Sequence, residues 1–239
     1  MKIVAISDTH GHLPKPDTLK GDVLLIAGDI APAYDHSVGF QEQWFKTTFI
    51  DWCKKIIDRG LTICWTGGNH DWYLEELYKN GYNKEFKDCL PENCHYLLDE
   101  MVIINDVKIF ASPWQPIFYD WAFNLTEEQL EKKFALMPAC KDRSIIDHSD
   151  NIDILLSHGP AMGYSDLVLQ HKRTDHLGSK ALLNRVKEVL PRYVITGHIH
   201  SADHNWQSMT AFNQEIKFAC VSLLDEQYKV AYKPLEFKI

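Results

Sequence analysis

The sequence contains no apolar run long enough to cross a membrane, no internal repeat and no tract of biased composition. A transmembrane helix needs about 20 predominantly apolar residues. The N-terminal segment MKIVAISD reaches a polar cluster after a short apolar run, and it falls far short of the apolar core of a signal peptide. We therefore expect a cytoplasmic protein that has no membrane partner.

Positive charge is also scarce. The chain has 25 Lys and Arg residues against 33 Asp and Glu residues, which gives a formal net charge of −8 at pH 7. Sequence-independent binding of nucleic acids depends on Lys and Arg side chains that neutralise many phosphates, so a nucleic-acid partner is not expected. A small phosphoester substrate, which could be a nucleotide, is compatible with this charge because bound cations can supply positive charge locally. Nothing in the sequence indicates an oligomeric state.

The six cysteines are too scattered for a metal site or a disulfide framework. The closest pair, Cys89 and Cys94, has no second pair at zinc-finger spacing. We expect reduced thiols that fill space in the protein core. The 239 residues, of which 45% are hydrophobic and 24% charged, are enough to bury one core. We predict a single domain over residues 1–239.

Short apolar runs alternate with longer amphipathic segments along the chain. The short runs are rich in β-branched residues and end at Gly or at a polar cluster, which is typical of buried strands. Amphipathic segments over residues 42–60, 126–137 and 178–190 have the apolar spacing of helices. Residues 101–114 and 218–239 each predict a β-hairpin. This alternation favours a layered α/β domain. The predicted strands are KIVAIS (2–7), DVLLIAG (22–28), LTICWTG (61–67), IDILLSHG (152–159) and YVITGHIH (193–200).

Polar residues gather just past these apolar runs. Asp8, Asp29, Asn69, His158 and His198 each follow a predicted strand, so in an α/β sheet they would meet at the carboxyl edge, where such folds bind ligands. Two further histidines, at positions 10 and 200, stand two residues after one of these polar residues. In an extended backbone such pairs point the same way, so each pair could reach one ion.

Together these residues predict a metal site. A single Asp-x-His or His-x-His pair is weak evidence, because a histidine is more often only hydrogen-bonded. Several carboxylates and imidazoles crowded together without a counter-ion would be costly to bury, whereas a metal cation offsets their charge. Mixed oxygen and nitrogen donors without a thiolate suit Mn²⁺, Fe or Zn²⁺. Seven candidate ligands are too many for one catalytic ion, and they fit two divalent or trivalent ions about 3.5 to 4 Å apart.

The motifs D-x-H, G-D, G-N-H-D, S-H-G-P and G-H-x-H follow one another in this order across most of the chain. This series resembles the signature of the calcineurin-like metallophosphoesterase superfamily. The resemblance implies an α/β/β/α sandwich, in which two facing mixed β-sheets are flanked by helices. It also implies that His70 is catalytic without being a ligand, and that the two ions are held by Asp8, His10, Asp29 and His200, and by Asn69, His158, His198 and the bridging Asp29.

Three segments resemble a narrower group, the metallophosphoesterase-domain-containing proteins: residues 111–124 (ASPWQPIFYDWAFN), DILLSHGP and YVITGHIH. That group includes phosphodiesterases of cyclic and other small phosphodiesters. A weak member is attributed to loss of the first His of G-H-x-H, and since His198 is present here the resemblance implies an intact site. Related protein phosphatases read G-D-x-x-D-R-G, whereas this chain has GDIAPAYD with Pro32 at that place, so a protein phosphatase is not expected.

The predicted reaction is the hydrolysis of small phosphodiesters, such as cyclic nucleotides or related phosphoesters, by a metal-activated hydroxide. Protonated His70 would donate a hydrogen bond to a phosphoryl oxygen or a proton to the leaving group. The first alternative is a slow or inactive nucleotide-binding or scaffold member of the family. The second is a nuclease of the same superfamily, although the chain has no basic stripe.

In G-N-H-D, adjacent side chains of an extended turn project to opposite sides, so Asn69 and His70 are not expected to bind the same ion. Asp71 either orients His70 or is a solvated loop carboxylate. Three aromatic residues, Trp72, Tyr164 and Trp206, follow the third, fourth and fifth motifs. They could stack on a nucleobase or pack the core and rim. Trp114 and Trp121 are assigned to structural packing.

Overall fold

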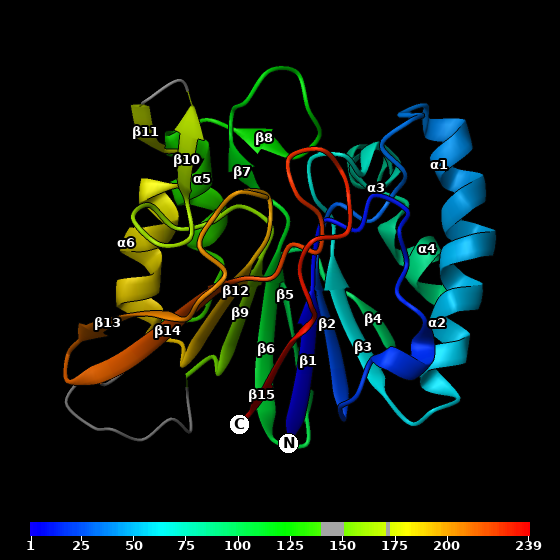
Figure 1. Cartoon of the computed structure of the whole chain (residues 1–239), viewed down its shortest axis with the longest axis horizontal. Helices are drawn as coiled ribbons and strands as arrows, with labels where there is room; N and C mark the ends of the chain where they lie inside the picture. The colour runs from blue at the N-terminus through cyan, green and yellow to red at the C-terminus, as the bar shows by residue number, and fades with distance from the viewer. Residues whose placement is uncertain (140–150, 171–172) are drawn as a thin grey trace.

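The computed structural model describes residues 1–139, 151–170 and 173–239, and its centre consists of two β-sheets (Figure 1). In the first sheet the strand order is β15-β1-β2-β3-β4. Strands β1 to β4 are parallel, and the edge strand β15 is antiparallel to β1. The strands span β1 Lys2–Ile6, β2 Val23–Ala27, β3 Thr62–Thr66, β4 Cys94–Tyr96 and β15 Leu235–Lys238.

The second sheet has the order β13-β14-β12-β9-β6-β5. Its four central strands are parallel, and the two edge strands are antiparallel to their neighbours. Two short strand pairs, β7 with β8 and β10 with β11, form small sheets of their own. The strands are β5 Glu100–Ile104, β6 Val107–Ser112, β7 Gln115–Pro116, β8 Asn124–Leu125, β9 Ile154–Ser157, β10 Leu167–Gln170, β11 Arg173–His176, β12 Tyr193–Thr196, β13 Gln207–Ala211 and β14 Gln214–Cys220.

Side chains on alternate residues of each strand point into two different apolar layers. Ile3 and Ala5 of β1 belong to a buried cluster that also contains Leu156 of β9 and Ile195 of β12, so this cluster lies between the sheets. Val4 and Ile6 of β1 belong instead to the cluster formed with the helices. The period of two follows from strand geometry. All five predicted strands are confirmed, and both faces of each are buried.

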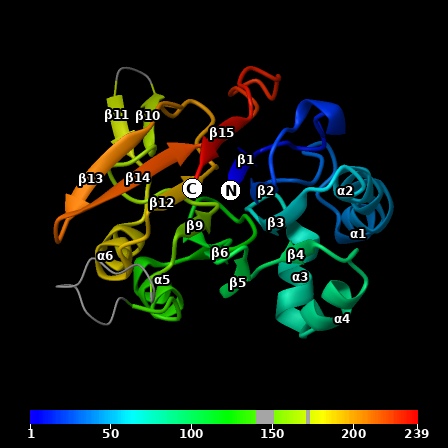
Figure 2. The ribbon, with the colours of Figure 1, turned by 90° about the horizontal axis from the view of Figure 1, so that it is seen from below.

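Helices cover the outer face of each sheet (Figures 1 and 2). The helices predicted over residues 42–60, 126–137 and 178–190 are confirmed, although the first begins earlier and contains a π-helical segment, η2. Helices α3 and α4 were not predicted. The α/β/β/α sandwich is confirmed. Beside the first sheet lie α1 Val38–Trp44, η2 Phe45–Phe49, α2 Ile50–Ile57, α3 Trp72–Asn80 and α4 Asn83–Asp88; beside the second lie α5 Glu127–Phe134 and α6 Lys180–Val189; a 3₁₀ turn, η1, spans Pro16–Thr18.

One of the two predicted hairpins is confirmed. Strands β5 and β6 are joined by Asn105 and Asp106, which both have positive φ, as a two-residue hairpin turn requires. The hairpin predicted over residues 218–239 is reduced to one antiparallel bridge, between Leu224 and Val230, because the long strands of this segment do not pair with each other: β14 belongs to the second sheet and β15 to the first. Strand β14 pairs instead with β13, through a turn in which Phe212 and Asn213 have positive φ.

The parallel strands of both sheets point in the same direction. A parallel bridge between Ser7, just past β1, and Ser222, just past β14, joins the two sheets. The carboxyl ends of β1, β2, β3, β9 and β12 therefore meet at one end of the molecule, opposite the two chain termini in Figure 1. This arrangement brings together the loops that carry the predicted site residues.

The cysteines fit the predicted reduced state in the part of the chain that the structure describes. All five described thiols are free, and Cys89 alone among them is exposed rather than packed in the core. Cys140 lies outside the described residues. Within those same ranges, no helix combines the length and the apolar character that a membrane crossing would need.

Candidate metal centre

The predicted site residues come together at the carboxyl ends of the strands. The loops after β1, β2 and β3 contribute from the first sheet, and the loops after β9 and β12 contribute from the second. All of these side chains are buried except that of His198, which is half-buried. The first sheet supplies Asp8, His10, Asp29, Asn69 and His70, and the second supplies His158, His198 and His200.

The backbone that presents these side chains is not extended. Asp8, His10, Asp29 and His198 have φ values of 50°, 42°, 52° and 71°. Non-glycine residues are uncommon in this left-handed region, where the strain costs on the order of 1 kcal/mol or more. Cross-loop hydrogen bonds hold two of them, from Asp8 N to the Gly28 carbonyl and from His10 N to the Asp29 carbonyl, each 3.0 Å. The predicted convergence is correct, but the extended geometry from which we argued is wrong.

A first group of donors consists of Asp8, His10 and His200. The Nε2 atoms of His10 and His200 are 3.4 Å apart, and His200 Nε2 is also 3.4 Å from Asp8 Oδ1. Single donor atoms from these three residues all lie within 4.8 Å of one another. Two imidazole nitrogens and a carboxylate oxygen thus face a common point.

A second group surrounds Asn69. Its Oδ1 atom is 2.9 Å from His158 Nε2 and 2.7 Å from His198 Nδ1. The carboxylate of Asp29 lies between the groups, with Oδ2 3.8 Å from His10 Nε2 and 3.4 Å from His158 Nε2. Asp29 therefore lies between the two groups, and its role as a bridging ligand stays a prediction.

The buried carboxylates and imidazoles of this cluster shift one another's pKa values. Burial alone would raise the pKa of Asp8, but its hydrogen bond and charge interaction with His200 lower the pKa to about 2. Burial alone would lower the pKa of His158, yet the nearby charge of Asp29 raises it to about 9. The buried carboxylates keep their negative charge and draw positive charge toward them. The Nε2 atom of His10 faces His200 and Asp29, whereas its Nδ1 atom is buried without a hydrogen-bond partner among the described residues.

Two motif glycines allow the loops to approach this closely. A Cβ atom on Gly197 would lie 1.8 Å from Ser7 Oγ and 2.4 Å from Asp8 Oδ2. A Cβ atom on Gly68 would lie 2.3 Å from Asp29 Oδ1. Because real Cβ atoms do not come so near, any side chain at these positions would push the donor groups apart.

His70 is fixed beside Asp29 by its backbone. The His70 N–H donates to Asp29 Oδ1 at 2.7 Å, and the His70 carbonyl accepts from Gln41 Nε2 at 2.7 Å. The ring packs against Trp121, with centroids 4.2 Å apart. Burial lowers the pKa of His70. A donor atom of His70 also lies within reach of His10 and Asp29, so the catalytic, non-ligand role of His70 stays a prediction.

Asp71 serves neither of the two purposes considered for it. Its side chain is fully buried, so it is not a solvated loop carboxylate. The carboxylate accepts hydrogen bonds from the backbone N–H groups of Ile30, Ala31 and Gly68, at 3.0, 2.8 and 2.9 Å. Burial and the nearby charge of Asp29 raise the pKa of Asp71 to about 7. Asp71 joins the loops after β2 and β3, and it supports His70 only through the backbone.

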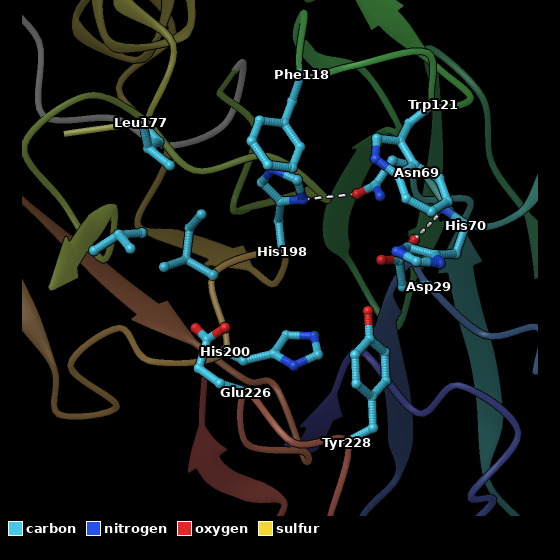
Figure 3. Close-up of a pocket in the computed structure, with 12 residues that line it drawn as sticks. Asp29, Asn69, His70, Phe118, Trp121, Leu177, His198, His200, Glu226 and Tyr228 are labelled. Atoms are coloured by element: carbon cyan, nitrogen blue, oxygen red, sulfur yellow. Dashed lines mark hydrogen bonds between the residues drawn. The ribbon is translucent and has the colours of Figure 1, made fainter. Parts of the chain in front are cut away.

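A cavity of about 180 Å³ opens onto the donor groups (Figure 3). Its polar lining includes Asp29, Asn69, His70, His198 and His200. Its apolar lining consists of Phe118, which lies beside His198 in Figure 3, together with Val168, Leu177 and Ile199. Among the lining residues that the structure describes, none is Lys or Arg.

The rim of this cavity carries residues that the sequence motifs did not place there. Trp121 packs against His70, in keeping with its assignment to structure, and it also lines the cavity, whereas Trp114 is buried in the core as predicted. Tyr228 points its hydroxyl toward Asp29 in Figure 3, and Glu226 lies near His200. Phe118 and Trp121 fall within the segment 111–124 that carries the narrower resemblance. Tyr228 belongs to a loop with no signal in the sequence.

The three aromatic residues considered for base stacking lie in different surroundings. Tyr164 stacks on Phe218 at 4.1 Å and packs against the core. Trp206 contacts Tyr193 and Phe237 beside β12 and β15. Trp72 is half-buried and lies 6.4 Å from Trp121, measured between ring centroids. None of the three lines the cavity described above.

The chain is similar to known proteins over most of its length. The family model described as calcineurin-like phosphoesterase matches residues 1–202. The chain is 32% identical over 219 residues to metallophosphoesterase domain-containing protein 1 of Homo sapiens, and the match covers 83% of this chain and 60% of that protein. A UPF0046 protein of Caenorhabditis elegans is 29% identical over 223 residues, with coverage of 84% and 51%. The chain thus spans 60% or less of the length of these relatives.

Solved structures share the fold. The crystal structure of TT1561 of Thermus thermophilus superimposes with a TM-score of 0.55 at 11% sequence identity. This superposition covers 95% of the present chain and 96% of the other. At such low identity the likeness concerns the arrangement of sheets and helices alone.

Proposed function

Because the chain belongs to the calcineurin-like phosphoesterase family, we propose that it is an active metal-dependent hydrolase of small phosphodiesters, cyclic nucleotides among them. The position of Asp29 Oδ2 carries this proposal. This atom lies 3.8 Å from His10 Nε2 in one donor group and 3.4 Å from His158 Nε2 in the other. One oxygen shared by two groups of donors is suited to a pair of ions, which is a common arrangement for phosphoester hydrolysis.

The residues present fit two ions that accept mixed nitrogen and oxygen ligands, such as Mn²⁺, Fe or Zn²⁺. When bound, these ions would supply Lewis-acid activation of water and of the phosphoryl group. Both ions would share the carboxylate of Asp29, which would fix the position of one donor group relative to the other. We assign Asp8, His10, Asp29 and His200 to one ion, and Asp29, Asn69, His158 and His198 to the other.

His70 is the side chain we assign to the substrate. Its backbone is held on both sides, by Asp29 and by Gln41, and its ring lines the cavity. A hydrogen bond from this ring to a phosphoryl oxygen, or a proton passed to the leaving oxygen, would stabilise charge that develops during the reaction. Because the ring is fixed before substrate arrives, little reorganisation is needed.

The cavity favours a substrate with a single negative charge. A phosphodiester carries one such charge, whereas a phosphomonoester or a polyphosphate carries more. Glu226 stands at the rim and no Lys or Arg is among the described lining residues, so phosphate charge beyond what the bound ions neutralise would find no cationic side chain there. The apolar lining residues Phe118, Val168 and Leu177 can contact an ester group of the substrate.

The test compares diester and monoester substrates at known metal content. We expect the Mn²⁺-loaded protein to hydrolyse bis-p-nitrophenyl phosphate and at least one 2′,3′- or 3′,5′-cyclic nucleotide with higher kcat/KM than p-nitrophenyl phosphate. Asp29→Asn should abolish all of these activities. A fully loaded protein without activity on any diester would overturn the proposal; nucleotide binding without turnover would then identify the slow or scaffold alternative. Preferential cleavage of an oligonucleotide would identify a nuclease.

A further inference from the structure

A second histidine contacts the ring of His70 from outside the predicted motifs. His36 lies in the loop between β2 and α1, and its Nε2 atom is 3.2 Å from His70 Nδ1. The ring centroids are 5.1 Å apart with an interplanar angle of 65°. Among the described side chains, no other forms a hydrogen bond with the His70 ring. The other ring nitrogen of His70, Nε2, is thereby left for the cavity.

His36 is itself held in place. Its ring meets Trp121 edge to face, with centroids 5.1 Å apart at 83°, and Trp121 in turn packs against His70. The three rings therefore contact one another in a closed set. The backbone around His36 is also held, because Asp35 Oδ1 accepts a hydrogen bond from Ser37 N at 2.9 Å, directly before α1 begins. His36 is half-buried rather than mobile on the surface in this arrangement.

The segment that carries His36 also holds the backbone of His70. Gln41, fully buried in α1, donates to the His70 carbonyl and accepts from Tyr73 N at 3.0 Å. The same loop and helix thus fix both parts of His70, the backbone through Gln41 and the ring through His36. The alternative partner in the motif, Asp71, is already occupied by three backbone N–H groups.

We propose that His36 is a positioning residue for His70. By its hydrogen bond to Nδ1 it sets the rotation of the His70 ring, so that Nε2 is the nitrogen presented to the substrate. An imidazole without this partner can rotate about its Cβ–Cγ bond, which exchanges a nitrogen for a carbon at the reacting position. Side chains that orient a functional histidine in this way contribute to activity without touching substrate. The inference rests on the proposed function, because it presumes that His70 acts on a phosphoester.

The experiment separates the hydrogen bond from ring packing. His36→Phe keeps an aromatic ring against Trp121 but removes both nitrogens, and His36→Gln restores a polar atom near the position of Nε2. His12→Phe makes the same change at an exposed histidine on the neighbouring loop. We expect His36→Phe to lower kcat for bis-p-nitrophenyl phosphate about 10- to 100-fold with KM nearly unchanged. His36→Gln should recover most of this loss, and His12→Phe should match the wild type.

A double-mutant cycle distinguishes positioning of His70 from a general structural role. In the background of His70→Ala, adding His36→Phe should cause no further loss, because there is no ring left to orient. Metal content by elemental analysis and the melting temperature should stay near the wild-type values. If His36→Phe were poorly folded, His36→Leu would remove the same nitrogens with a smaller side chain.

Two results would overturn the inference. One is a His36→Phe kcat equal to that of His12→Phe, and the other is a loss that persists in full in the His70→Ala background. Failure of the proposed function is distinct from these: the loaded wild-type protein would then hydrolyse no phosphodiester. If the wild type is active and substitution of His36 does not change kcat, the positioning role of His36 is contradicted but the proposed function is not.

Discussion

The carboxylate of Asp71 accepts hydrogen bonds from three backbone N–H groups on two loops. Removal of this side chain would leave these buried donors without partners, and each such donor costs about 1 to 3 kcal/mol. We expect Asp71→Ala to lower the free energy of unfolding by about 3 to 5 kcal/mol. Urea denaturation followed by circular dichroism measures this change.

Asp51 offers a matched control for that substitution. Its carboxylate is exposed and pairs with Lys54, three residues further along the same helix. Asp51→Ala should change the free energy of unfolding by less than about 1 kcal/mol. Equal effects of the two substitutions would show that Asp71 does not hold the loops together.

His70 is the residue whose loss should separate chemistry from metal binding. If it acts on the phosphoryl group rather than on an ion, His70→Ala should lower kcat about 10²-fold or more. The bound metal, measured by elemental analysis, should stay near the wild-type amount. A variant that loses metal would instead place His70 among the ligands, a role that its distance from His10 and Asp29 permits.

At the residue scale, the sequence predicted which donor residues come together, but it did not predict the residues that surround them. The spacing of D-x-H and G-H-x-H pointed to the residues that converge, although the backbone at Asp8 and His198 is left-handed rather than extended. His36 and Tyr228 carried no signal, because neither belongs to a motif and both reach the site through loops. Which loop folds back over a site depends on tertiary packing, which local patterns do not encode.

Among the structural elements, the ends of β1 and β12 approach so closely that Gly197 has no room for a side chain. Its Cβ atom would collide with Ser7 and with the Asp8 carboxylate. We expect Gly197→Ala to move the two loops apart and to weaken metal affinity about 10- to 100-fold. Metal titration monitored by calorimetry measures this loss.

Gly39 provides the comparison, since a Cβ atom there meets no atom within 4 Å. It lies in helix α1, where Ala is favoured over Gly by up to about 1 kcal/mol. Gly39→Ala should therefore leave metal affinity unchanged and raise the melting temperature slightly. Unchanged metal affinity in Gly197→Ala would mean that the strand ends can separate without disturbing the donors.

Helices and strands with a regular spacing of apolar residues were predictable from the sequence. Strand pairings between distant parts of the chain were not. The five buried strands and three amphipathic helices follow from apolar spacing within each segment. Strand β15 has the same local appearance as a hairpin partner of β14, yet it crosses to pair with β1. The turn that closes β13 and β14 uses Phe212, a residue rarely associated with positive φ, so its sequence did not reveal it.

For the molecule as a whole, the donors are divided between two sheets that otherwise meet through an apolar layer. Ions bound there would link the sheets and stabilise the folded state by mass action, by about 2.7 kcal/mol at a free metal concentration 100 times Kd. For a protein of this size we expect chelation to lower the melting temperature by roughly 5 to 10 °C. Differential scanning calorimetry with and without chelator measures the shift.

Asp29→Asn tests whether that shift comes from the site. This variant keeps the shape of the shared side chain but removes its charge, so its melting temperature should respond much less to chelator. A wild-type melting temperature that ignores chelator, in protein shown to contain metal, would contradict a linking role for the ions.

The layered architecture was predictable from the alternation of strands and helices together with the motif resemblance. The direct contact between the two sheets at the site was not, because the parallel bridge between Ser7 and Ser222 joins residues more than 200 positions apart. The cavity and its apolar lining lie where the two sheets meet.

Because the donors are divided between the two sheets, the metal centre can form only late in the folding of a newly synthesised chain. A chain that has reached only the end of β3 already contains Asp8 and Asp29, and Asn69 follows within three residues, but His158, His198 and His200 come after a long stretch of sequence. Closure of such distant contacts is slow compared with the formation of helices. The proposed activity would therefore appear late in folding, because a molecule with most of its secondary structure in place would not turn over substrate until its two halves had docked.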